Sequence, residues 1–107
     1  MSAEKVRALN DAFRTTMTGG KVLLTAGVNA LPADVKAMVI RRVVTFSEFN
    51  EENDPHQEHD FGDFSYAGRK FFWKIDHFDA KMEFGSEDPS NPSRTTRVLT
   101  IMFVEEY

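Results

Sequence analysis

The sequence predicts an α+β domain in which two helices pack on one face of a mainly antiparallel, curled sheet of about four to five strands. Three observations lead to this prediction. Apolar residues recur at helical spacing in two early segments, one apolar run lies between these segments, and aromatic-rich alternating runs fill the second half of the chain. The length of 107 residues, of which 41% are hydrophobic, favours a single domain over residues 1–107. A half-barrel curled around the aromatic residues is the alternative architecture.

The first half of the chain is expected to contain helix, strand and helix. Ser2 can cap a first helix, because apolar residues follow it at near-helical spacing. Residues 21–28 predict a buried strand, since apolar and β-branched residues run together between glycines. Pro32 suits the first turn of a second helix, which we expect to end between residues 46 and 49.

The second half of the chain is expected to form the rest of the sheet. Residues 50–59 are polar and broken by a proline, which predicts a loop. Two alternating runs, 61–66 and 70–78, flank an Ala-Gly pair and predict a hairpin. A short strand at 81–84 and a long one at 96–104 complete the sheet.

Alternation along the second hairpin strand divides its side chains between two faces of the sheet. The side chains expected to pack against the helices are Phe71, Trp73 and Ile75. Lys74 and Asp76 share the opposite face, where we expect them to form a polar pair with Arg97 of the last strand.

Composition excludes several classes of function. The chain has no cysteine, so disulfides, thiolate metal sites and cysteine nucleophiles are excluded. The N-terminus lacks the pattern of a signal peptide, and no apolar stretch approaches the roughly 18 residues that a membrane span needs. We therefore expect a cytoplasmic protein with no membrane partner and no cofactor.

The net charge of −4 is unevenly distributed along the chain. The interval between Arg42 and Arg69 holds seven acids and no lysine or arginine. The rest of the chain holds ten acids and thirteen bases. We call residues 48–60 the acidic segment. The carboxylates that we predict to bind a partner are Glu48, Glu51, Glu52, Asp54, Glu58 and Asp60. Clustered carboxylates resemble a nucleic-acid backbone and suit a basic protein surface, whereas a merely solvated loop is the structural alternative.

Histidines and carboxylates in the same region suggest a different chemistry. Imidazole and carboxylate groups are ligands for zinc, manganese and iron. The candidate metal ligands are His56, His59, Asp60 and His77. This alternative predicts a small metal-dependent hydrolase or nuclease. The loop position of the two nearest histidines lacks the helical spacing of established metal motifs.

The aromatic residues of the hairpin support a third interpretation, a small-molecule-binding module. Residues 69–74 also mix bases with aromatics, as single-strand nucleic-acid platforms do. The sequence pI of about 5.3 argues against direct nucleic-acid binding.

Several strings carry a resemblance to a known family. They are EHDFG at 58–62, FWKID at 72–76, TTRVLTIM at 95–102 and EEY at 105–107. Here the sequence resembles a family of small uncharacterised proteins, mainly alphaproteobacterial and often borne on plasmids or phage-like elements, catalogued only as a domain of unknown function. The resemblance covers nearly the whole chain and implies no catalytic residues. Its mobile-element setting implies a role in conflict between host and element.

The first interpretation is therefore a non-enzymatic protein that binds a protein partner through the acidic segment. The resemblance points to an inhibitor of a nucleic-acid-binding host defence complex, of the anti-restriction or anti-CRISPR type. The metal-dependent enzyme and the small-molecule-binding module are the alternatives. The sequence does not predict an oligomeric state.

Overall fold

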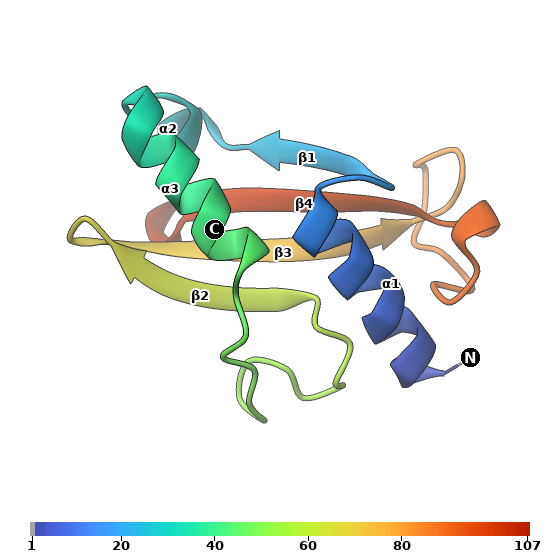
Figure 1. Ribbon diagram of the computed structural model, residues 1–107. Helices are drawn as coiled ribbons and strands as arrows, with labels where there is room; N and C mark the ends of the chain where they lie inside the picture. Colours follow the sequence, from blue (N-terminus) through green and yellow to red (C-terminus); the bar gives the residue numbers. More distant parts are fainter. Residues whose placement is uncertain (1) are drawn as a thin grey trace.

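Residues 2–107 are described by the computed structural model, in which helices cover one face of a four-stranded sheet (Figure 1). The elements are α1 (Ala3–Thr16), β1 (Lys21–Leu24), α2 (Ala26–Asn29), α3 (Ala33–Val44), β2 (Phe61–Tyr66), β3 (Arg69–Phe78) and β4 (Thr96–Phe103). Short 3₁₀ turns occupy Pro92–Arg94 and Val104–Glu106. The predicted α+β class is confirmed. No helix among residues 2–107 is long and apolar enough to cross a membrane.

The sheet has the strand order β1-β4-β3-β2. The β2–β3 and β3–β4 pairs are antiparallel, whereas β1 runs parallel to β4. The sheet is therefore mixed rather than mainly antiparallel. Parallel pairing needs a long connection, and here α3 and the β2–β3 hairpin lie between β1 and β4 in the chain. The sheet has two edges and does not close into a barrel.

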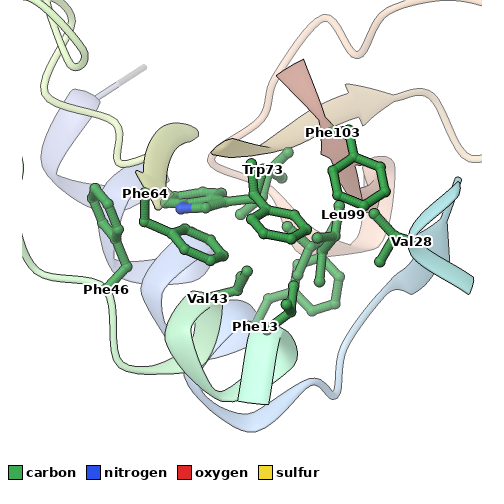
Figure 2. Close-up of a cluster of buried hydrophobic side chains, with 12 residues drawn as sticks. Phe13, Val28, Val43, Phe46, Phe64, Trp73, Leu99 and Phe103 are labelled. Atoms are coloured by element: carbon green, nitrogen blue, oxygen red, sulfur yellow. The ribbon is translucent and has the colours of Figure 1, made fainter. Parts of the chain in front are cut away.

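The core lies between the sheet and the helices α1 and α3 (Figure 2). Phe71, Trp73 and Ile75 are buried in it, which confirms the predicted orientation of β3. Trp73 packs edge-on against Phe46 with 5.5 Å between ring centroids. Burial of this apolar surface is the main term that holds the helices to the sheet. The aromatics of the predicted small-molecule module are thus partly core.

The segment predicted as one buried strand at 21–28 is divided in two. Only Lys21–Leu24 forms a strand, which lies at the edge of the sheet and is largely exposed. Residues 26–29 form α2, because Glu106 accepts hydrogen bonds from Thr25 Oγ1 at 2.7 Å and from the Gly27 backbone N–H at 3.0 Å. A carboxylate at these free N–H groups stabilises the start of a helix.

Three further expectations are wrong. Residues 81–84 form turns rather than a strand, and only an isolated bridge joins Phe78 to Gly85. Arg97 does not join the Lys74–Asp76 ion pair, because Arg97 lies beside His77 in the sheet register and points to the helix-covered face. Pro32 precedes α3 as its N-cap instead of lying in the first turn.

Candidate functional site

The acidic segment connects α3 to β2 without regular secondary structure, yet side chains fix its backbone. Asn50 Oδ1 accepts hydrogen bonds from the backbone N–H groups of Glu52 and Asn53, at 2.9 and 3.0 Å. The Asn53 side chain also bonds to the backbone of the turn. Its Oδ1 accepts from Asn50 N at 2.9 Å, and its Nδ2 donates to the Glu48 carbonyl at 3.0 Å. Asparagine side chains that bond to nearby backbone stabilise such turns. The first half of the segment is therefore a defined turn.

The six predicted partner-binding carboxylates do not share one environment. Glu48, Glu51 and Glu52 are exposed on this turn. Asp54, in contrast, is only 6% exposed, so it is not part of a surface. Glu58 and Asp60 are half-buried, and burial raises the pKa of both carboxyls, with a smaller contribution from neighbouring negative charge. The structure thus leaves three of the six carboxylates exposed, two half-buried and one buried.

Asp54 and Asp11 hold His59 from two sides. Asp54 Oδ1 accepts the His59 backbone N–H at 2.9 Å, and its Oδ2 lies 3.5 Å from His59 Nε2. His59 Nδ1 lies 2.9 and 3.0 Å from the two carboxylate oxygens of Asp11. The imidazole also stacks on Phe49, with 3.6 Å between centroids. Both ring nitrogens face carboxylates, and only a protonated ring can donate to both.

His59 has a left-handed backbone, with φ of +53°. For a residue with a side chain this conformation is uncommon and costs on the order of 1 kcal/mol or more. The contacts to Asp54 and Asp11 hold the residue in it. We call Asp11, Asp54 and His59 the histidine clamp.

A second polar cluster lies between α1 and the sheet, with Asn10 and Arg97 buried and His77 half-buried. Asn10 is completely buried, and its Nδ2 donates to the Glu58 carbonyl at 2.9 Å. Asn10 Oδ1 accepts from Arg97 Nε at 2.7 Å and lies 3.1 Å from His77 Nε2. Arg97 also donates to the Pro89 carbonyl. The cluster fixes the end of the acidic segment to α1.

The electrostatics of this cluster keep His77 neutral. Burial, and next the positive charge of Arg97, lower the pKa of His77 to about 4. Burial also lowers the pKa of Arg97. Because an amide oxygen only accepts, the neutral His77 ring must carry its proton on Nε2 to bond to Asn10.

Arg14 fixes the start of the connection between α3 and β2. It is 3% exposed, and its guanidinium donates to three carbonyls at the end of α3. These carbonyls belong to Val43, Val44 and Phe46, at 2.8, 3.2 and 3.1 Å. Arg14 also bonds to Asp11 at 3.2 Å and lies over the Trp73 ring at 5.1 Å. A cation at the C-terminus of a helix is favourable for both the free carbonyls and the helix dipole.

The three α1 residues that hold the segment, Asn10, Asp11 and Arg14, were not among the predicted site residues. A signal for two of them was present in the sequence. Asn10 and Arg14 follow Val6 at intervals of four, so they lie on the same helix stripe as this buried residue. Polar residues at core positions of a helix indicate a buried partner.

The four predicted metal ligands lie in separate environments. His56 is exposed, Asp60 is half-buried, His59 belongs to the histidine clamp, and His77 bonds to Asn10. Across residues 2–107, no three or more His, Cys, Asp or Glu side chains are grouped so as to hold a metal ion. The side-chain placement therefore gives the metal interpretation no support.

A hollow of about 310 Å³ opens beside the histidine clamp. Its lining includes Phe49, Glu51, Pro55 and Arg7, and Arg7 donates to the Gln57 carbonyl at 3.1 Å. The hollow is open to solvent and combines apolar walls with charged groups of both signs. It can accept a side chain that projects from another surface.

Comparison with known proteins places the chain in a family. Residues 24–106 match the DUF3768 family, which is described as a protein of unknown function. The chain belongs to the DUF3768 family. No curated protein and no solved structure matches it. The DUF3768 match includes the whole acidic segment, His77 and Arg97, whereas Asn10, Asp11 and Arg14 of α1 precede it.

Proposed function

We propose that this DUF3768 protein is a non-enzymatic cytoplasmic protein that binds a basic surface of a protein partner through the exposed carboxylates of the acidic segment. One observation carries the proposal: the segment is irregular, yet hydrogen bonds fix it at its turn, at the histidine clamp and at Asn10. A loop that is ordered before binding loses less conformational entropy when a partner docks. The fixed turn therefore supports a role in recognition more than it supports a solvated loop without a binding role.

The charge of the turn supports the choice of a basic partner. Glu48, Glu51 and Glu52 are exposed, and within residues 2–107 they make no ion pair. Their negative potential is thus available to lysine and arginine side chains of another molecule. Complementary charge raises the association rate and disfavours acidic partners. The hollow beside the clamp gives such a side chain a place to enter.

We further propose that the partner is a nucleic-acid-binding complex of a host defence system. Channels that hold a phosphate backbone are lined by lysine and arginine. A rigid acidic turn is suited to occupy such a channel and exclude the nucleic acid. The choice of a defence complex as the partner rests on the negative charge of the turn and on the resemblance to proteins of mobile elements.

The test compares two variants of equal net charge. The first carries Glu48→Gln, Glu51→Gln and Glu52→Gln. The control carries Glu4→Gln, Glu83→Gln and Glu87→Gln, three exposed positions outside the segment. A partner is captured from host lysate with the wild type, and its dissociation constant is measured for all three proteins. We expect the first variant to weaken binding by about tenfold or more at low salt, and the control to bind like the wild type.

Salt and competition supply the remaining readouts. The affinity of the wild type should fall as salt is added, because attraction between solvated charges is screened over about 8–10 Å. Duplex DNA should compete with the wild type for the partner. Equal affinity of the two variants would refute the acidic surface, and absence of DNA competition would refute the defence-complex step alone.

A further inference from the structure

The two edges of the sheet differ in how they are protected. At the β2 edge, Arg42 donates a hydrogen bond to the Ser65 carbonyl at 3.2 Å, and Asp63 carries a charge. At the β1 edge, Val22 and Leu23 are 37% and 51% exposed. Figure 1 shows β1 at the rim of the sheet, with β4 as its only strand neighbour. Natural proteins block exposed apolar edges unless another strand joins them.

The register shows which backbone groups of β1 are open. Thr25 N donates to the Ile101 carbonyl of β4 at 3.1 Å. In a parallel strand, alternate residues direct both their N–H and C=O groups to the same neighbour. Leu23 therefore bonds to β4, whereas Val22 and Leu24 direct their N–H and C=O groups away from the sheet.

We propose that β1 pairs antiparallel with β1 of a second copy of this chain across a two-fold axis, joining two four-stranded sheets into one. In the central register, Val22 of each copy faces Leu24 of the other. These residues exchange all the open donors and acceptors of both strands. Leu23 then faces Leu23 of the second copy.

The side chains suit this register. Leu23 is the most exposed residue of its strand among the large apolar side chains. In the proposed register it occupies a non-hydrogen-bonded pair, where opposed Cβ atoms approach to about 4.5–5.5 Å. The two leucines therefore cover each other on the sheet face that lacks helices.

Charge complementarity favours a second copy as the occupant. The same register sets Lys21 opposite Thr25 of the second copy, and Thr25 donates to Glu106. Within residues 2–107, Lys21 makes no ion pair, and the Glu106 carboxylate is bonded by Thr25, Gly27 and Phe103 without a cation. Each Lys21 thus approaches a carboxylate that makes no ion pair within its own chain, and the contact occurs twice by symmetry.

The expected dimer is weak. A four-residue strand buries much less than the roughly 1,200 Å² of a stable interface. Association should therefore depend on concentration in the micromolar to millimolar range. This inference is independent of the acidic segment, which lies on the connection between α3 and β2.

The test uses a proline at each edge of the sheet. Val22→Pro removes an outward N–H at the β1 edge without removing a bond to β4. Ser65→Pro is the matched control at the β2 edge. The two-residue turn makes Tyr66 and Arg69 a hydrogen-bonded pair, so the N–H of the preceding residue, Ser65, points away from β3 and its loss removes no bond within the sheet. Circular dichroism establishes that both variants are folded. Sedimentation velocity is measured from about 10 to about 500 µM.

We expect the wild type and Ser65→Pro to dimerise as concentration rises, and Val22→Pro to associate at least about tenfold more weakly. Lys21→Glu should weaken the dimer as well, since it places two acids together. Amide hydrogen exchange supplies the specific readout: the Val22 and Leu24 amides should become protected with concentration. A chain that stays monomeric throughout, a dimer that Val22→Pro does not weaken, or a wild-type dimer in which these two amides stay unprotected would overturn the proposal.

Discussion

Trp73 is the largest fully buried side chain of the core. It is fully buried at the centre of β3, with Phe46 against one edge and the Arg14 guanidinium 5.1 Å from its ring. Its contacts join the sheet to α1 and to the end of α3. Removal of so large a side chain leaves a cavity that rigid neighbours cannot fill.

Trp73→Ala is therefore expected to lower the free energy of unfolding by about 3–5 kcal/mol. Urea denaturation of the wild type and the variant measures this loss. Phe84→Ala is the control, because Phe84 is 71% exposed and its truncation should stay within about 0.5 kcal/mol of the wild type. A loss below about 1 kcal/mol for Trp73→Ala would contradict its place in the core.

The sequence predicted the orientation of side chains correctly where apolar and polar residues alternate strictly. It did not predict the orientation of buried polar side chains. Apolar residues at every second position placed Trp73 correctly. Arg97 also lies at an inward position of its strand, but the sequence predicts an exposed side chain there because arginine is rarely buried. Its hydrogen bonds to Asn10, which is distant in sequence, and to the Pro89 carbonyl explain why it is tolerated inside. Single-residue patterns carry no information about such a partner.

Among the elements, the acidic segment has the least regular backbone and depends on side chains for its order. Asp54 is the central acceptor, since it holds both the backbone and the ring of His59. Asp54 is buried, so its carboxylate is not available on the surface that we propose for the partner. It is therefore a positioning residue for the proposed surface.

Asp54→Ala should loosen the acidic segment while the sheet stays folded. Leaving the His59 N–H without its acceptor is expected to cost about 1–3 kcal/mol. Hydrogen exchange should accelerate over residues 50–60 and remain slow in β3 and β4. Glu51→Gln removes a charge of the same sign from an exposed position, and its exchange should match that of the wild type. Unchanged exchange in Asp54→Ala would show that the segment is held by other contacts.

Elements with a strong period were predictable, and short apolar ones were not. Helical spacing identified α1 and α3, alternation identified β2 and β3, and a long apolar run identified β4. The run at 26–28 is too short for its period to separate helix from strand. Its helical state is set by Glu106, which lies 79 residues after Gly27 in the chain. The surroundings of the candidate metal and partner residues were likewise not predictable, because they depend on which distant side chains each residue meets.

For the whole molecule, the class of fold was predictable but the mixed sheet was not. The parallel pairing of β1 with β4 joins residues near the two ends of the sequence, such as Lys21 and Val98. No local pattern encodes that pairing. It also creates the free β1 edge, so the proposed contact between two copies follows from topology rather than from any motif.

The stability of the whole molecule should depend on pH through His77. Its pKa is about 4 in the folded protein and close to 6.5 when the chain is unfolded. Between these values the unfolded state binds more protons, so the free energy of unfolding falls as pH falls. Two carboxyls act in the opposite direction, because the pKa values of Glu58 and Asp60 are raised by burial. The lowered pKa values of Asp88, Glu105 and Glu106 add stability at neutral pH that is lost only at more acidic pH.

The contribution of His77 is isolated by comparing pH slopes rather than absolute stabilities. Urea unfolding is measured between pH 7.5 and pH 5 for the wild type and for His77→Gln, whose amide can donate to Asn10 but does not take up a proton in this range. We expect the wild type to lose about 1–2 kcal/mol more than the variant over this interval, because only the wild type must suppress protonation of a buried ring. His56→Gln, which removes an exposed histidine, should keep the wild-type slope. Parallel slopes for the wild type and His77→Gln would mean that the Asn10–His77–Arg97 cluster opens before the fold does, and that its burial does not govern acid stability.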